Sequence, residues 1–146
     1  MSEMEINTEG KKSPAGWLLI MMVVYCLASL LHFIHNAEFI SEYPNLPNWI
    51  TASGVYITWF GITSIGIVGY SLVSRGKVFM GLVTCAVYGA IGLDGLGHYT
   101  LAPISAHTFT MNFTILLEAI TAVILLVVVT GMFFSYFKDR YKVVLK

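Results

Sequence analysis

Four long apolar stretches constrain this chain more than any other feature of its sequence. They cover about residues 17–39, 49–73, 78–97 and 105–135 of the 146. Each supplies the roughly 20 predominantly apolar residues that a helix needs to cross a bilayer. A mean hydropathy of +0.77, with only 11% charged residues, excludes an ordinary soluble domain of this size. The sequence therefore predicts an all-α protein, a four-transmembrane-helix bundle in the lipid bilayer.

The remaining segments are too short to form a soluble domain. Residues 1–13 are polar and mixed in charge, so we expect a flexible tail there. The transmembrane domain is expected to cover 14–137, and 138–146 to form a basic tail. We also expect Asn48 and Ser105 to cap the second and fourth long helices.

The positive charges fall in three places that a four-pass topology brings to one side of the membrane. They lie before the first stretch, between the second and third, and after the fourth: Lys11, Lys12, Arg75, Lys77, Lys138, Arg140, Lys142 and Lys146. Because Lys and Arg accumulate in cytoplasmic loops, both termini are predicted to be cytoplasmic. The expected localisation is integral and multi-pass, in a bacterial-type inner membrane or a plasma membrane. No nucleic-acid partner is expected, and a homo-oligomer or a subunit of a larger membrane complex stays open.

Ionisable side chains gather on the opposite side of this predicted bundle. They come from LHFIHNAEF at the end of the first stretch and from DGLGHYTLAPISAHTFTMNFTILLE between and within the last two: His32, His35, Asp94, His98, His107 and Glu118. Ionisable groups inside a membrane generally face the bundle interior and have a partner. No Lys or Arg is available at their depth, which leaves a cation, a proton or a hydrogen-bond network as compensation. The glycines of GLDGLG predict that the third helix distorts or ends near Asp94.

Metal binding is the first function that this cluster predicts, because imidazole and carboxylate are good ligands for copper, zinc or iron. Asn36 and Glu38 are predicted to orient imidazoles of the site from outside it, and Glu118 to lie beneath it as a proton-transferring or substrate-contacting group. The predicted metal ligands, which would form an outward-facing site, are His32, His35, Asp94, His98 and His107.

One part of this pattern resembles a known family. Asp94, His98 and the later His107 are similar to the Asp-x3-His and later His of the copper-binding membrane subunit of particulate methane and ammonia monooxygenases. The resemblance covers about fourteen residues, with a shorter gap to the second histidine and a smaller chain. It implies a copper site at these three residues.

Other functions remain open at this point, including whether the protein is an enzyme at all. A metal-free enzyme would use His107 or His98 as base and Glu118 as acid on a small, apolar, lipid-like substrate, with Tyr56 and Trp59 lining a cavity wall. A haem b electron-transfer protein would use His32 and His98 as axial ligands. Proton transfer along the helix that carries Glu118 is a further possibility, and the plainest is that these groups only hydrogen-bond neighbouring helices.

Overall fold

The structure, a computed structural model, describes residues 14–144, and within them it contains helices and no strands. The elements follow one another as α1 (Pro14–Glu38), η1 (Ile40–Glu42), α2 (Ala52–Ser74), α3 (Val78–Ile91), η2 (Asp94–Gly97), α4 (His98–Leu101), η3 (Ile104–Ala106) and α5 (Phe109–Val144). Four helical segments are long and apolar enough to cross a membrane, and the third of them, Val78–Leu101, includes η2 and α4. The predicted all-α bundle of four transmembrane helices is therefore confirmed.

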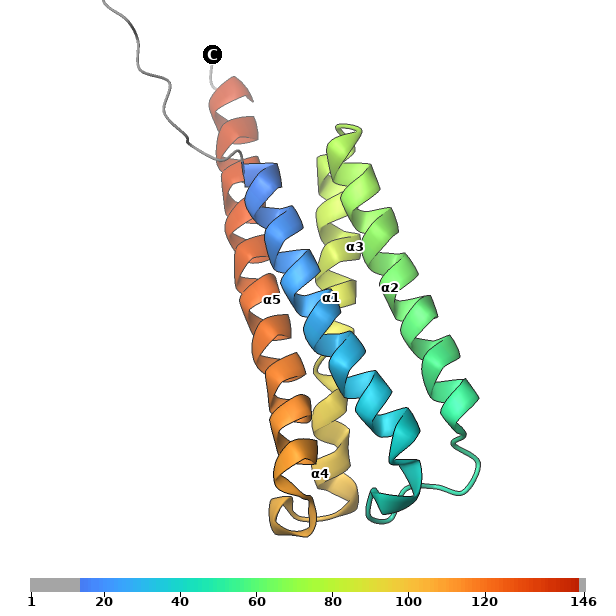
Figure 1. Ribbon diagram of the computed structural model, residues 1–146. Coiled ribbons are helices and arrows are strands. Elements are labelled where there is room, and N and C mark those ends of the chain that lie inside the picture. Colours follow the sequence, from blue (N-terminus) through green and yellow to red (C-terminus); the bar gives the residue numbers. More distant parts are fainter. Residues whose placement is uncertain (1–13, 145–146) are drawn as a thin grey trace, which may run out of the picture.

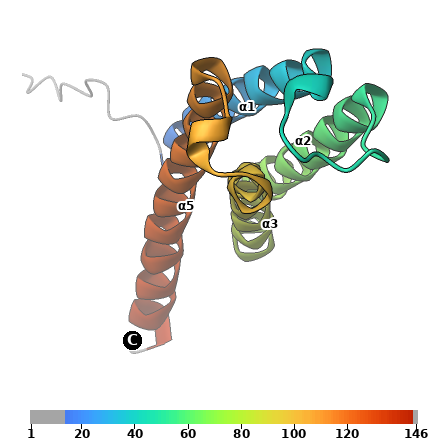
Figure 2. The ribbon, with the colours of Figure 1, turned by 90° about the horizontal axis from the view of Figure 1, so that it is seen from below.

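The four spans lie in a ring in which each contacts its neighbours in the order α1, α2, α3 and α5 (Figure 2). The start of α1 and the end of α5 lie at the same end of the ring (Figure 1). We call the half of the bundle at that end the terminal half, and the half that carries His32, His98 and His107 the histidine half. That the termini face the cytoplasm stays a prediction. The flexible tail expected at 1–13 also stays a prediction, since those residues lie outside the described part of the chain.

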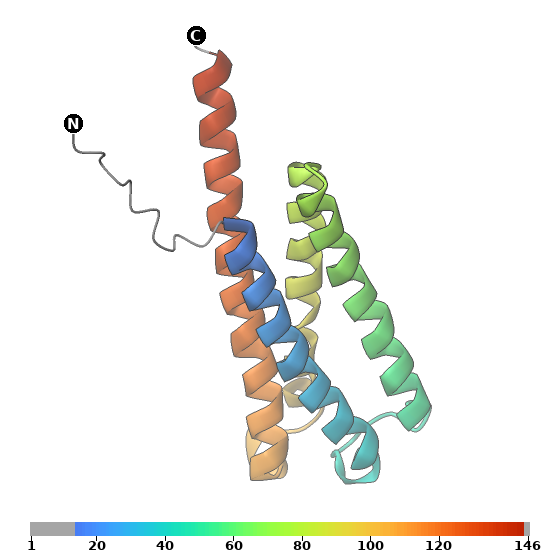
Figure 3. The same cartoon turned by 45° about the horizontal axis from the view of Figure 1, so that its top comes forward.

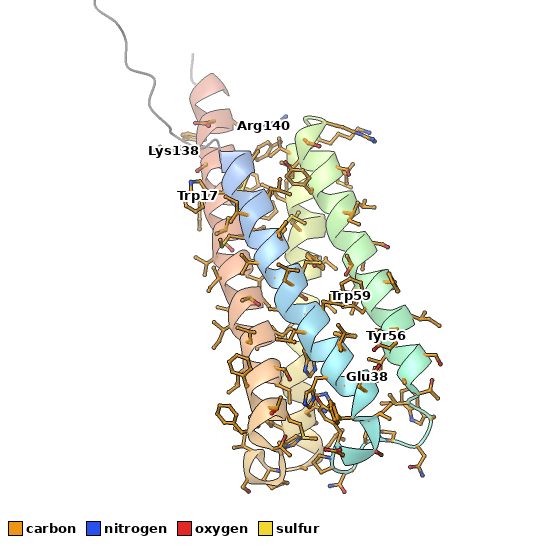
Figure 4. All side chains as sticks on the ribbon, viewed as in Figure 1. Trp17, Glu38, Tyr56, Trp59, Lys138 and Arg140 are labelled. Carbon is orange, nitrogen blue, oxygen red and sulfur yellow. The ribbon has the colours of Figure 1, made fainter. Side chains whose placement is uncertain are left out.

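The segment 138–144, which the sequence assigns to a basic tail, continues the helix α5 and extends beyond the other helices (Figure 3). Trp17 on α1 lies near Lys138 and Arg140 at this end of the bundle (Figure 4). Trp17 is half-exposed, with 51% of its surface accessible. An exposed tryptophan beside basic residues is typical of the boundary between a membrane and water.

Helices α2 and α3 pack most closely in the terminal half, where glycines replace side chains at their contact. A Cβ added to Gly81 would lie 2.6 Å from the backbone nitrogen of Val73, and one added to Gly69 would lie 3.0 Å from that of Cys85. The short turn that joins the two helices contains Gly76 with φ of 79°, a conformation that favours glycine. Both cysteines are free, and the buried Cys85 packs in the apolar core.

From this contact α2 and α3 diverge toward the histidine half (Figure 1). The regular helix α3 ends at Ile91, and the chain continues as the 3-10 turn η2 from Asp94 to Gly97 before the short helix α4 begins. This confirms the predicted distortion near Asp94. Asp94, Gly95 and Gly97 of GLDGLG line a cavity beside η2.

The two expected helix caps are wrong by a few residues. Thr51, not Asn48, caps α2, since its side chain accepts a hydrogen bond of 3.1 Å from the Gly54 backbone N–H. Ser105 lies in the 3-10 turn η3, and the Thr108 hydroxyl accepts the Met111 backbone N–H at 3.3 Å at the start of α5. Short turns before both helices delay each start.

Candidate functional site

A cavity of about 640 Å³ lies in the histidine half, between α1, α2 and the η2–α4 segment. One wall is apolar and includes Val55 and Ile62 of α2. The other walls carry polar groups from four elements: His32 and Asn36 of α1, Asp94 of η2, His98 of α4 and Glu118 of α5. We call this space the histidine cavity. A mostly apolar hollow with a few convergent polar groups is the usual form of a small-molecule site.

The mouth of the histidine cavity lies between α2 and the η2–α4 segment. The exposed residues of its lining all belong to these two sides: Trp49, Thr51 and Thr58 on one, Asp94, Thr100 and Leu101 on the other. Thr58 and Asp94 both lie within candidate membrane spans. The cavity is therefore open sideways between two spans as well as toward the loop before α2.

The closed end of the cavity is formed by His32 and Glu118, each only 2% exposed. The His32 Nε2 atom lies 3.7 Å from Oε2 of Glu118. That oxygen accepts no hydrogen bond from any residue in the described part of the chain. A buried carboxyl oxygen without a hydrogen bond is costly and calls for an explanation.

The tautomer of His32 follows from its other neighbour. The Thr114 hydroxyl donates its one hydrogen to the Met111 carbonyl at 3.1 Å, so toward His32 Nδ1, 3.4 Å away, it is an acceptor. Nδ1 of His32 is then the protonated nitrogen, and a neutral ring presents the lone pair of Nε2 to Glu118. Two facing lone pairs repel each other, so the pair needs one further proton, held by Glu118 or by His32.

Gly95 brings the backbone of η2 against this pair. A Cβ at Gly95 would lie 3.2 Å from Glu118 Oε2 and 3.7 Å from His32 Nε2. A methyl group at this position would therefore press on the carboxyl group. At Gly97, two residues further along, a Cβ would meet nothing within 4 Å.

The other three histidines form separate hydrogen bonds. Asn36 Nδ2 donates to His98 Nε2 at 3.0 Å, and the Tyr43 hydroxyl lies 2.9 Å from His35 Nδ1. His107 Nδ1 donates to the Pro103 carbonyl at 3.1 Å. The prediction that Asn36 orients an imidazole is confirmed.

Tyr43 is a residue of this region that sequence reasoning did not assign to the site. It is only 4% exposed, its hydroxyl bonds His35, and its ring lies 4.8 Å from that of His98. Burial raises the pKa of Tyr43 to about 12. The hydroxyl therefore stays protonated at ordinary pH while it shares a hydrogen bond with His35. In the sequence, Tyr43 stands in a proline-containing loop, and nothing there indicates that it contacts His35.

The predicted ligands of a metal do not form a ready-made site. Within residues 14–144, no group of three or more His, Cys, Asp or Glu side chains is arranged to hold a metal ion. The rings of His32 and His98 are 5.5 Å apart and those of His98 and His107 are 6.3 Å apart. His32, Asp94 and His98 line the cavity, whereas His35 and His107 do not.

Two expectations about the surroundings of the cluster are wrong. Glu38 does not orient an imidazole, since its carboxylate accepts a 2.7 Å hydrogen bond from the Tyr56 hydroxyl, which joins α1 to α2 (Figure 4). Tyr56 and Trp59 do not line the cavity either. They lie where α1 and α2 meet, and α2 presents Thr58 and its apolar neighbours to the cavity instead.

The fold and this site define a multi-pass membrane protein with a polar cavity at one end of a four-helix bundle. No protein-family model matches the sequence, and neither a curated protein nor a solved structure is significantly similar to it. The function must therefore be inferred from the geometry of the histidine cavity.

Proposed function

We propose that the protein binds a small, mostly apolar molecule from the membrane in the histidine cavity and moves a proton on it. The single observation that carries this proposal is the unbonded Glu118 Oε2, 3.7 Å from His32 Nε2 at the closed end of a cavity with an apolar wall. Buried polar groups usually find partners within a protein. A pair that keeps one oxygen free beside a cavity is suited to contact a ligand.

The chemistry that this pair supports is acid–base catalysis. The lone pair of His32 Nε2 removes a proton from one carbon of the substrate, while the Glu118 carboxyl delivers its proton to another carbon. The product is an isomer, because the proton lost and the proton gained balance. The mouth between α2 and α4 supports access from the bilayer, where an apolar substrate dissolves.

This proposal differs from the roles that the sequence suggests for the acid and the base. Glu118 keeps its role as acid, but His32 takes the role of base that sequence reasoning gives to His107 or His98. His107 lies outside the cavity lining, and Asn36 donates to Nε2 of His98, so that this lone pair is already in use.

Isotope exchange tests the proposal and does not require that the substrate be identified first. The protein is reconstituted with a total lipid extract in D₂O, and mass spectrometry searches for a lipid-soluble compound that gains a deuterium on carbon. We expect labelling by the wild type and none by Glu118→Gln. Glu42→Gln changes an exposed acid outside the cavity and is the matched control, with labelling as in the wild type. Equal labelling by Glu118→Gln contradicts the proposal.

A transition-metal centre remains the second candidate, because His107 keeps one nitrogen free. His107 is 6% exposed, and its Nε2 has no hydrogen-bond partner among the described residues. A metal centre here needs His98 to leave Asn36 and turn toward His107. Elemental analysis of the purified protein decides between the two candidates. About one copper, zinc or iron per chain in the wild type, lost in His107→Ala, supports the metal centre, and metal content far below one per chain supports acid–base chemistry.

A further inference from the structure

The histidine cavity has two carboxyl groups in its lining, those of Asp94 and Glu118, and no Lys or Arg beside them in the described part of the chain. Lys138 and Arg140 lie at the opposite end of the bundle (Figure 4). Glu118 lies at the closed end beside His32, whereas Asp94 is the exposed acid at the mouth.

Asp94 lies within a membrane span and has no ion pair with any residue from 14 to 144. It is seven residues before the end of the span Val78–Leu101, about 10 Å at the helical rise of 1.5 Å per residue. The one described ion pair within 4.0 Å joins His32 to Glu118, and Asp94 is exposed at the cavity mouth. A carboxylate at this depth is costly unless a cation or a proton accompanies it.

We propose that the natural ligand of the histidine cavity is an amphiphile with a protonated amine, which Asp94 binds at the mouth. The inference rests on the proposed function and specifies its substrate class. The ammonium group pairs with the Asp94 carboxylate, and the apolar body lies against Val55 and Ile62 of α2. The carbon atoms next to the amine then reach His32 and Glu118, which approach Asp94 through the adjacent Gly95. Binding itself involves no covalent change.

The size of the cavity and its wall favour an organic cation over the other charged ligands. A bare metal ion would leave most of the 640 Å³ unfilled and would not use the apolar wall. A fatty acid would bring a second negative charge beside Asp94, which repels it. A long-chain alcohol fits the wall equally well but leaves the Asp94 charge without compensation.

Three probes that differ only in their polar end test this inference. They are an alkyl dimethylamine, the matching alcohol and the matching carboxylate, each brominated at several positions along the chain. Bromine quenches tryptophan fluorescence on contact, and Trp49, 80% exposed, lines the cavity near its mouth. Quenching is measured in nanodiscs of a zwitterionic lipid, and the part lost in Trp49→Phe reports on this site.

We expect the amine to bind about tenfold more tightly than the alcohol, the gain from one ion pair in a poorly hydrated site. Asp94→Asn should reduce this preference to about twofold or less, whereas Glu42→Gln should keep it. Equal binding of amine and alcohol to the wild type overturns the inference and leaves the proposed function standing. No Trp49-dependent quenching by any of the three probes overturns both. Asp94 is exposed, so its replacement by Asn should not disturb folding, and circular dichroism checks this.

Discussion

The two halves of the bundle use the same four helices in opposite ways. In the terminal half, glycines bring α2 and α3 into backbone contact, and the core is a continuous apolar cluster that includes Leu18, Leu82 and Leu125. In the histidine half, α2 and α3 diverge, and His32 and Glu118 face a cavity with an oxygen left unbonded by the described residues. The contrast suggests that close packing at one end stabilises the protein and permits an open, polar site at the other.

If that division of roles is right, substitutions in the terminal half should reduce stability most. Gly81→Ala puts a methyl group 2.6 Å from the Val73 backbone nitrogen, so α2 and α3 must move apart. We expect a loss of about 2–3 kcal/mol in the free energy of unfolding. Gly61→Ala, where a Cβ meets nothing within 4 Å, is the matched control and should lose nothing. Unfolding by SDS in mixed micelles, followed by circular dichroism, measures both. Similar values for the two variants would show that this contact does not hold the bundle together.

A smaller effect is expected at the edge of the histidine half, where a hydrogen bond joins the Tyr43 hydroxyl to His35 Nδ1. Tyr43→Phe removes one buried hydrogen bond and should cost about 1 kcal/mol at pH 7. Because the pKa of Tyr43 is raised from 10.0 to about 12, its contribution is present below pH 10 and is lost as the pH rises toward 12. The difference in stability between the wild type and Tyr43→Phe should therefore shrink over that interval. A difference that stays constant up to pH 12 would contradict this assignment.

At the closed end of the cavity the effect on function should exceed the effect on stability. Gly95→Ala brings a methyl group to 3.2 Å from Glu118 Oε2. We expect a loss below about 1 kcal/mol, since the carboxyl group can shift into the cavity. Deuterium labelling in D₂O should nevertheless fall strongly, because the pair is displaced. Gly97→Ala adds its methyl group in open space and should label as the wild type does. Normal labelling by Gly95→Ala would show that the His32–Glu118 pair does not carry out the proton transfer.

Much of this contrast between the halves is present in the sequence. Four apolar stretches predict the helices, and GLDGLG correctly predicts the break in regular helix at η2. These features depend on composition and on helical spacing along one segment, which a sequence displays directly.

The pairing of side chains across helices could not be predicted in the same way. Glu118 meets His32 because α5 and α1 align in one particular register, and Glu38 reaches Tyr56 instead of an imidazole for the same kind of reason. His107 turns to the Pro103 carbonyl because η3 brings that backbone group within 3.1 Å. Registers between helices and short turns depend on packing of the whole bundle, so residue spacing within one segment does not determine them.

Glu118 is proposed to serve a ligand and not to hold the helices together, and one stability measurement tests this directly. Glu118→Met replaces the acid by an apolar side chain of similar size and removes a carboxyl group whose Oε2 has no hydrogen bond within the described part of the chain. The His32 ring that remains is neutral and keeps its hydrogen bond to Thr114, so no buried charge loses a partner. The free energy of unfolding should therefore stay unchanged or rise by about 1 kcal/mol. Thr114→Val, which removes a bonded hydroxyl beside the same pair, should lose about 1 kcal/mol. A loss of roughly 2 kcal/mol or more in Glu118→Met would show that the carboxyl group is structural.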